Sequence, residues 1–464
     1  MKILVCIKQA QSGELNPFDA SAYEAALRIK NSDDEVMLLS MAPKKSEEML
    51  LSLTRLGAEK AYLLNDKAFA GADTLATSYA LGLAVKKLSP DLIICGRQSI
   101  DGDTAQTGPS LSVSVGYNLI TNVMSIERTG EKITCTTREK ESRDVSFPAL
   151  ITVERFCSLR FPRMRSKLGE VITYCAEDIN ADTSRCGLAG SPTQVLRTFE
   201  NNEGKRKCRF ISPCELDGVI KSAREKGRAR LAPVSQSAVK LSEVWIIGEK
   251  PREMAETVAQ NVRVIQPDTP ENIAELIRKE KPSVVLWASD YYSKATAPQV
   301  ASILSTGLCA DCTALETDGE KLFMYRPAFS GNIIAKIACK TLPQMATVRT
   351  ADTQDSDMIV GVGLGGAKYM DSIEKFAHKY NAELGASRAA VDAELLEYEN
   401  QIGLTGKQVS PSVYVAVGIS GAVHHIEGMK RSGTVIAINS DKNAPIFDYA
   451  DFGIIADVKD LFYL

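Results

Sequence analysis

The sequence from Leu384 to Asn439 contains the pattern that decides the fold. It reads Leu384-Gly385-Ala386-Ser387-Arg388-Ala389-Ala390-Val391-Asp392, then Ile402-Gly403-Leu404-Thr405-Gly406-Lys407, then Gly418-Ile419-Ser420-Gly421-Ala422-Val423-His424-His425, and ends with Ile438-Asn439. Apolar runs at 382–386, 413–417 and 434–438 come directly before three of these pieces. Strands followed by small, polar turns predict an open parallel sheet, whose carboxyl edge is where ligands bind. A dinucleotide suits such an edge, because glycine lets the backbone come close and helix N-termini attract phosphate.

Length and composition exclude several classes of protein. A chain of 464 residues corresponds to about three domains of roughly 150 residues each. The hydrophobic fraction of 44% and the charged fraction of 24% are ordinary for a globular protein, and a net charge of -3 does not favour nucleic acid. No apolar run approaches the roughly 18 residues of a membrane span. The N-terminus reads as a buried strand and not as a signal peptide, so the eleven cysteines are expected to be reduced thiols in the cytoplasm.

The first 120 residues alternate between predicted strands and helices. Strands are expected at 3–7, 36–40, 61–64 and 92–95, and helices at 16–30, 46–56 and 74–88. This alternation predicts a parallel sheet with helices on its faces. The last strand runs into a long polar turn at 96–109, which is again where a ligand would bind.

The middle of the chain predicts a change of architecture. Residues 123–153 read as antiparallel strands, and a basic stretch follows between Arg155 and Lys167 that reads as a solvated arm. A helix is expected from 214 to 226, and residues 231–242 are expected to be a linker.

The alternation restarts after the linker and repeats the first part of the chain. Residues 90–95 are echoed by 282–287, and residues 147–153 are echoed by 342–348, which predicts two similar sandwiches related by a pseudo-twofold axis. The second copy has Ser289-Asp290-Tyr291-Tyr292-Ser293 in place of the long polar turn, and no nucleotide is expected there. Trp245 and Trp287 are expected in its core. Gly361-Val362-Gly363-Leu364-Gly365-Gly366 is a G-x-G-x-x-G pattern, which alone would favour an NAD-dependent dehydrogenase.

The glycine-rich pieces together resemble the electron-transfer flavoproteins. The turns at 384–392, 402–407, 418–425 and 437–439, with Ala444-Pro445-Ile446-Phe447, resemble the FAD domain of the alpha subunits. Residues 5–9, 16–19 and 96–109 are similar to the nucleotide-binding segments of the beta subunits. The resemblance implies an α/β fold with two similar parallel-sheet domains that carry antiparallel hairpins, and a C-terminal doubly wound FAD-binding domain. It also implies a pseudo-heterodimer within one chain: a beta-like part at 1–230, the linker at 231–242, a shortened alpha-like part at 243–355 and the FAD-binding domain at 356–464.

The resemblance assigns one set of residues to FAD: Ser387, Arg388, Ile402, Gly403, Leu404, Thr405, Ser420, Gly421, Ala422, Val423, His424, His425, Asn439 and Asp457. Within this set, Arg388 would be a permanent cation beside the flavin ring, Thr405 would donate to flavin N5 and His425 to flavin C2=O. Leu364 and Leu404 stand where the family usually has Arg and Gln. Arg326-Pro327-Ala328-Phe329-Ser330-Gly331-Asn332 matches an alpha-subunit signature expected in the flavin cleft.

A second set would bind a nucleotide in the beta-like part: Cys6, Asn16, Asp101, Gly102, Asp103, Thr104, Ala105, Gln106 and Thr107. The family binds either AMP there, as a structural ligand, or a second FAD that takes hydride from NADH in electron-bifurcating members. The segments 96–106 and 187–194 favour the second FAD.

The implied function is electron transfer between partner flavoproteins such as an acyl-CoA dehydrogenase, with a docking loop around Cys186 or Leu188 and no catalytic or metal-binding residues. Cys309-Ala310-Asp311-Cys312 is one CxxC pair without the second pair that a zinc site requires. The alternatives are the NAD-dependent dehydrogenase and a degenerate, non-redox nucleotide-binding protein.

Overall fold

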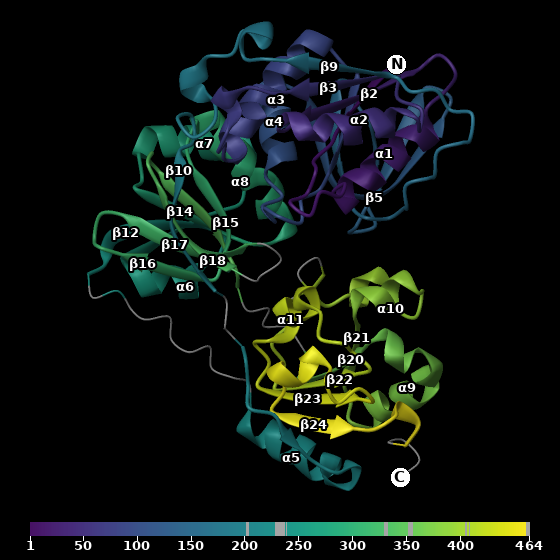
Figure 1. Cartoon of the computed structure of the whole chain (residues 1–464). Helices are drawn as coiled ribbons and strands as arrows, with labels where there is room; N and C mark the ends of the chain where they lie inside the picture. The colour runs from purple at the N-terminus through teal and green to yellow at the C-terminus, as the bar shows by residue number, and fades with distance from the viewer. Residues whose placement is uncertain are drawn as a thin grey trace. The chain divides into compact units, whose positions relative to one another are not determined.

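The computed structural model describes the chain apart from residues 201–203, 228–236, 238, 329–332, 351–355, 404–405, 408 and 461–464. It divides into two compact units (Figure 1). Unit 1 comprises Met1–Thr198, Ser237–Phe329 and Ala335–Arg349, and unit 2 comprises Phe199–Gln236, Ser330–Ile334 and Thr350–Leu464. The domain boundaries expected at 230, 243 and 356 stay predictions.

The first sheet of unit 1 has nine strands in the order β7-β6-β5-β8-β4-β1-β2-β3-β9. Its strands are β1 (Lys2–Cys6), β2 (Glu35–Met41), β3 (Lys60–Leu64), β4 (Leu92–Gly96), β5 (Asn118–Thr129), β6 (Lys132–Thr137), β7 (Ser142–Asp144), β8 (Ala149–Val153) and β9 (Glu170–Tyr174). One face packs on α1 (Pro17–Ile29) and α2 (Glu47–Thr54), and the other on α3 (Thr74–Leu88) and α4 (Thr107–Val115). Because both faces are covered, the central strands are almost continuously apolar, as in Leu92-Ile93-Ile94-Cys95.

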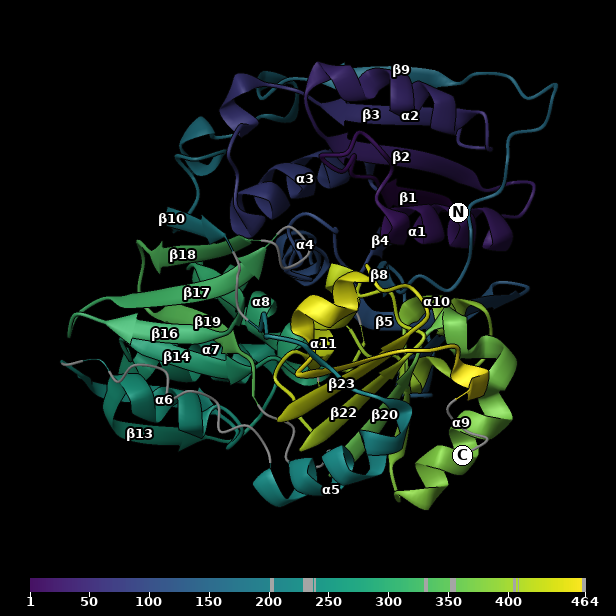
Figure 2. The same cartoon turned by 60° about the horizontal axis from the view of Figure 1, so that its bottom comes forward.

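The second sheet of unit 1 repeats the centre of the first. Its order, β13-β12-β14-β19-β15, matches β2-β1-β4-β8-β5, and its strands are β12 (Leu241–Ile247), β13 (Ala259–Ile265), β14 (Val284–Ala288), β15 (Leu308–Cys312) and β19 (Gln344–Val348). Trp245 and Trp287 are buried on the face covered by α7 (Pro270–Glu280) and α8 (Tyr291–Leu304). Helix α6 (Arg252–Val258) packs on the other face. Equivalent helices α4 and α8 lie side by side (Figure 2), joined by the Ser110 hydroxyl, which donates to the Pro298 carbonyl at 3.2 Å.

A third sheet in unit 1 mixes the two parts of the sequence. Its order is β10-β18-β17-β16, with β10 (Thr193–Glu200), β16 (Ala314–Thr317), β17 (Leu322–Ala328) and β18 (Ile333–Cys339). Strand β10 comes from the beta-like part, and the other three come from the alpha-like part (Figure 2). The sequence pattern did not predict β10, because its residues are exposed and lack an apolar run.

Unit 2 is built on one sheet with the order β11-β24-β23-β22-β20-β21. The strands are β11 (Arg209–Phe210), β20 (Met358–Val362), β21 (Glu383–Ala386), β22 (Val413–Val417), β23 (Thr434–Asn439) and β24 (Phe452–Ile455). Helices α5 (Leu216–Lys226) and α9 (Met370–Lys379) pack on one face, and α11 (Val423–Met429) packs on the other; α10 (Arg388–Asp392) follows β21. The junction expected at 200–242 therefore contributes β11 and α5 to this unit.

Two local predictions need correction, and the residue at the N-cap of α1 has another role. Strand β8 is parallel to both β4 and β5, so within 123–153 only the β5–β6 and β6–β7 pairs are antiparallel. The helix expected at 46–56 is a 3-10 turn at Lys44–Ser46 followed by α2. Asn16 does occupy the N-cap position of α1, but its side chain makes no capping hydrogen bond; it donates to the Gln98 carbonyl at 2.9 Å.

Candidate cofactor sites

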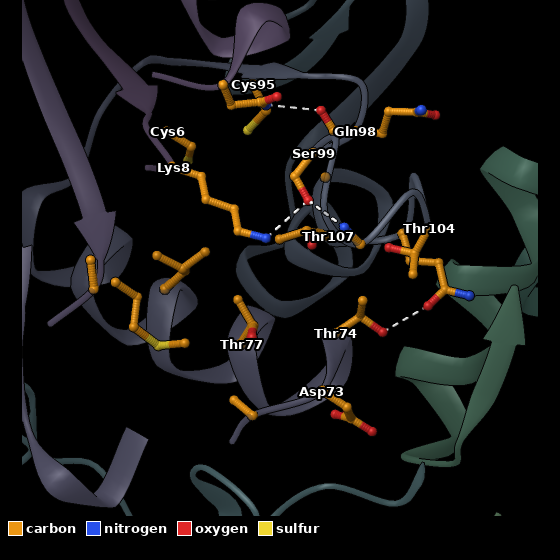
Figure 3. A pocket seen from close by; sticks show the side chains of 18 of the residues that line it. Cys6, Lys8, Asp73, Thr74, Thr77, Cys95, Gln98, Ser99, Thr104 and Thr107 are labelled. Carbon is orange, nitrogen blue, oxygen red and sulfur yellow. Dashed lines mark hydrogen bonds between the residues drawn. The ribbon is translucent and has the colours of Figure 1, made fainter. Parts of the chain in front are cut away.

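Unit 1 contains a cavity of about 830 Å³ at the carboxyl ends of β1 and β4. The polar turn after β4, the first turns of α3 and the strand-to-helix turn before α1 form one part of its wall (Figure 3). The alpha-like part closes the wall with Leu308, Cys309, Ala310, Arg326 and Ile337. The cavity thus lies where the sequence predicted a nucleotide, but both halves of the repeat build it.

The turn at 97–106 is held in shape by its own polar side chains and by Lys8, which follows β1. The Lys8 ammonium donates to the Ser99 hydroxyl at 3.0 Å and lies 3.8 Å from the Asp101 carboxylate. The Gln98 amide donates to Asp103 Oδ1 at 3.1 Å, and Asp103 itself has a φ of 50°, in the left-handed region. Since an Asp side chain tolerates that region better than most, the residue type suits the tight turn.

Asn16 and Asp19 form a buried polar corner of the cavity. Asn16 is 1% exposed, and its Oδ1 atom has no hydrogen-bond partner although it is buried. Asp19 Oδ2 accepts the Lys8 backbone N–H at 2.8 Å. Burial raises the pKa of Asp19 to about 7, against the opposing effect of the hydrogen bonds from Asn16 and Lys8. Gly96 is required beside it, because a Cβ atom there would lie 2.4 Å from Asp19 Oδ1.

Arg326 lines this cavity; the expected place of 326–332 in the flavin cleft stays a prediction, and residues 329–332 lie outside the described residues. Arg326 extends from β17, and its Nη2 atom donates to the Gly102 carbonyl of the polar turn at 2.6 Å. The side chain is 7% exposed, and its buried Nε atom has no partner. Asn16 and Arg326 therefore come from the two halves of the repeat and both donate to carbonyls of the turn at 97–106, through Gln98 and Gly102.

Most residues predicted for the beta-like nucleotide site line this cavity. They are Cys6, Asn16, Gly102, Thr104, Ala105, Gln106 and Thr107. Asp101 and Asp103 belong to the turn but shape it through Lys8 and Gln98, without lining the cavity. Sequence reasoning included Lys8 and Asp19 only within the segments 5–9 and 16–19, and it missed Asp73, Thr74 and Thr77. The Asp-Thr-x-x-Thr spacing at 73–77 could have revealed these three, because it marks one face of a helix N-terminus.

The residues predicted for FAD gather at the carboxyl edge of the unit 2 sheet. Ser387 and Arg388 follow β21, Ser420 to His425 follow β22, Asn439 ends β23 and Asp457 follows β24. The strand order β21-β20-β22-β23-β24 reverses direction between β20 and β22, and ligands of such sheets bind beside that point. Leu404 and Thr405 lie outside the described residues, so Ile402, Gly403, Gly406 and Lys407 represent the second glycine-rich turn.

The glycines at the reversal point pack the two turns against each other. The Gly363 N–H donates to the Val417 carbonyl at 2.8 Å, and a Cβ atom on Gly363 would lie 2.1 Å from the Gly418 carbonyl oxygen. The backbone after Gly363 is a 3-10 helix (Leu364–Tyr369), and α9 begins at Met370. The G-x-G-x-x-G pattern therefore lacks the α-helix N-terminus that binds pyrophosphate in the dinucleotide fingerprint.

Several polar groups at this edge already have partners in the protein. Ser387 Oγ accepts the Ala390 N–H at 3.3 Å as the N-cap of α10, and Arg388 Nε lies 3.3 Å from Asp392 Oδ2. The Asn439 amide donates to the Ile419 carbonyl at 2.8 Å and so ties β23 to the turn after β22. Asp457 Oδ1 accepts the Lys459 N–H at 3.2 Å. These contacts pre-position the edge, and each leaves part of the side chain's bonding capacity for a ligand.

His425 is buried, whereas His378 is exposed and His424 is half-buried. The ring of His425 lies 2.9 Å from the Tyr414 hydroxyl through Nε2 and 3.1 Å from the Ile402 carbonyl oxygen through Nδ1. Burial lowers its pKa to about 4, and the Ile402 hydrogen bond opposes that shift only in part. The ring is therefore neutral at physiological pH.

Comparison with known proteins assigns the family. Residues 3–178 and 256–355 match the Electron transfer flavoprotein domain, and residues 352–430 match the Electron transfer flavoprotein FAD-binding domain. The chain belongs to the electron transfer flavoprotein family. It is 39% identical over 235 residues to the electron transfer flavoprotein subunit beta of Megasphaera elsdenii, covering 43% of this chain and 87% of the relative. It is 38% identical over 232 residues to the subunit alpha of Thermoanaerobacterium thermosaccharolyticum, covering 40% of this chain and 70% of the relative.

A third relative is subunit CarD of the caffeyl-CoA reductase-Etf complex of Acetobacterium woodii, 37% identical over 231 residues, which cover 43% of this chain and 87% of the relative. Similarity to both kinds of subunit identifies a fused beta–alpha electron transfer flavoprotein, with an FAD-binding domain and a role in electron transfer. Electron transfer flavoproteins work with partner dehydrogenases or reductases. Every helix within the described residues is too short or too polar to cross a membrane.

Proposed function

We propose that the unit 1 cavity binds a second FAD, so that this electron transfer flavoprotein takes hydride from NADH and divides the electrons between two acceptors. The observation that carries the proposal is the cavity volume of about 830 Å³. It lies in the upper part of the range of roughly 300–1,000 Å³ for sites that enclose a complete small ligand. AMP alone, the other ligand considered, would leave much of this volume to water.

The chemistry of the wall supports a dinucleotide. Apolar side chains such as Leu39, Leu64 and Phe69 offer surface for ring systems, and the turn at 97–106 offers polar groups. The Lys8 ammonium and the Arg326 guanidinium belong to cavity-lining residues and are suited to anionic oxygens. FAD supplies the redox chemistry, while these residues bind and orient it.

For the family's usual FAD in unit 2, we propose the residues at the carboxyl edge. Ser387, Ser420 and Asn439 would hold pyrophosphate or ribitol, Asp457 the adenosine end, and Arg388 would supply the fixed cation beside the ring. Ile402, Gly403, Gly421, Ala422, Val423 and His424 would line the site with Leu404 and Thr405. The literal NAD fingerprint needs no second explanation, because Gly363 and Gly365 pack against Gly418 and Gly361 packs against Tyr414.

The partner is proposed to be a flavoprotein dehydrogenase such as an acyl-CoA dehydrogenase. Of the two residues considered for the docking loop, Cys186 is buried and Leu188 is 64% exposed. A partner can bury the exposed Leu188 side chain but not the buried Cys186, so we assign the docking contact to Leu188.

Anaerobic mixing with NADH tests the second FAD. We expect NADH to bleach the flavin absorbance of the native chain. Thr77→Trp, which places a large side chain in the cavity wall on α3, should abolish bleaching by NADH while dithionite still reduces the remaining flavin. Lys86→Trp adds the same side chain at an exposed position of that helix and should behave like the native chain. Failure of NADH to bleach any flavin in the native chain would contradict the proposal.

A further inference from the structure

Two cysteines lie next to each other in the wall of the unit 1 cavity. Cys6 ends β1, Cys95 lies near the end of β4, and the two are direct partners in the parallel ladder between these strands. Both side chains line the cavity (Figure 3). They come from strands separated by almost ninety residues of sequence, so the sheet topology alone brings them together.

The Cα separation of the two positions allows a bond between them. In-register residues on neighbouring strands are about 4.8 Å apart, within the Cα separation of about 4.4–6.8 Å found across disulfides. Paired residues of a parallel ladder also point to the same face of the sheet. Both side chains also line the same cavity, so the two thiols belong to one surface of the sheet.

We propose that Cys6 and Cys95 form a reversible disulfide that reports whether the cavity is empty. A diffusible disulfide such as oxidised glutathione is the oxidant. The Cys6 thiolate attacks it, forms a mixed disulfide and releases one glutathione. The Cys95 thiolate then attacks the Cys6 sulfur, breaks the mixed disulfide and releases the second glutathione. Two protein thiols lose two hydrogens, and the glutathione disulfide gains them.

Exposure determines the order of the two steps. Cys6 is half-buried and opens to the cavity, whereas Cys95 is 6% exposed. Cys6 is therefore the thiol that a small oxidant reaches first, and Cys95 is the resolving thiol. Cys309 also lines the cavity, but from β15 in the alpha-like part and without a ladder partner among the other cysteines.

A ligand in the cavity would control this reaction. This step rests on the proposed nucleotide site, because a nucleotide that fills the cavity covers both thiols. Linkage then makes the effect reciprocal: if the nucleotide disfavours the disulfide, the disulfide weakens nucleotide binding by the same factor. Oxidation would thus hold an emptied chain in a form that rebinds nucleotide poorly.

Peptide mapping of the full chain tests the inference. The protein, with bound nucleotide removed on charcoal, is incubated with oxidised glutathione, alkylated, digested and analysed by mass spectrometry. We expect peptides joined through Cys6 and Cys95 that separate on reduction. Cys95→Ser should instead retain glutathione on Cys6, and Cys309→Ser should leave the yield of the Cys6–Cys95 link unchanged. Cys135→Ser, which replaces a buried thiol outside the cavity, controls for the effect of a substitution on the fold.

Parallel incubations with saturating AMP or FAD separate the two proposals. Suppression of the link by tenfold or more supports both. A link that forms equally with and without nucleotide supports the disulfide and contradicts the nucleotide site. No Cys6–Cys95 link in the nucleotide-free native chain, or a link through Cys309 in its place, overturns the disulfide, whichever nucleotide the cavity binds.

Discussion

The Nε2 atom of His425 lies 2.9 Å from the hydroxyl oxygen of Tyr414, and both residues are buried in unit 2. Since the Ile402 carbonyl can only accept, the hydrogen of the neutral ring is on Nδ1, and Nε2 accepts from Tyr414. In this arrangement the ring has no second N–H to donate. Donation from His425 to flavin C2=O would require one of these partners to be released, and it stays a prediction.

The buried His425 should make unit 2 sensitive to acid. Its pKa is about 4 in the folded chain, below the usual value of 6.5, so the unfolded chain binds the proton more tightly. The contribution to stability is present above pH 6.5 and is lost as the pH falls towards 4, by up to about 3 kcal/mol. Amide protection of β22, corrected for intrinsic exchange rates, measures it. His425→Gln should flatten this pH dependence, and His378→Gln, at an exposed site in the same unit, should not.

Asp19 should make the stability of unit 1 fall as the pH rises, which is opposite to the effect of His425 on unit 2. Its pKa is raised to about 7, so the unfolded chain releases the proton first and stability falls as the pH rises from about 4 to 7. Asp19→Asn removes the ionisation and should stabilise unit 1 at pH 8 by up to roughly 4 kcal/mol. Both tryptophans are buried in unit 1, so the urea midpoint from their fluorescence reports on this unit. A midpoint in Asp19→Asn that follows pH as in the native chain would refute the assignment.

Arg388 should set the potential of the unit 2 flavin. A charge about 4 Å from a reduced ring is worth about 4 kcal/mol at an effective dielectric constant of 20. Half of that, after screening, corresponds to roughly 80 mV for one electron. Arg388→Gln should therefore lower the measured one-electron potential by tens of millivolts. Asp392→Asn removes the carboxylate that lies 3.3 Å from Arg388 and should shift the potential upwards. Equal potentials in the native chain, Arg388→Gln and Asp392→Asn would contradict the assignment of Arg388 to the flavin site.

Arg326 should stabilise the nucleotide loop of unit 1. Arg326→Gln removes the guanidinium that donates to the Gly102 carbonyl, and a hydrogen bond from a charged group is worth about 1.5–3 kcal/mol. Nucleotide affinity at the cavity should fall by about tenfold or more, as measured by equilibrium dialysis with AMP and FAD. The matched control is Arg278→Gln, because Arg278 also donates to a backbone carbonyl, that of Ile303, but on α7 away from the cavity. A similar loss of affinity in both variants would count against a specific role.

The sequence predicted the parallel sheets well, because their central strands are buried on both faces. Runs such as Val413 to Val417 and Thr434 to Ile438 are apolar, end in turn residues and coincide with β22 and β23. The internal repeat was equally visible, and the matching strand orders of the two unit 1 sheets confirm it. The exposed strand β10 and the short strand β11 were missed because pairing with distant strands, and not their own composition, determines their structure.

The cavity was harder to predict than the fold. Its loop at 97–106 was identified from sequence, but Arg326 comes from more than two hundred residues further along the chain. Thr77 lies in ordinary helical sequence, where only the tertiary arrangement places it in the cavity wall. The register of Cys6 with Cys95 likewise depends on β1 and β4 being neighbours, which composition cannot reveal.

Release and quantification of the nucleotides bound to the purified chain is the most direct test of the account. Acid release followed by chromatography counts FAD and AMP per chain. The account predicts two FAD per chain in the native protein and one in Thr77→Trp. One FAD with one AMP would contradict the second flavin and leave an electron carrier with a structural nucleotide. No FAD even after reconstitution would contradict the proposed residues of both sites.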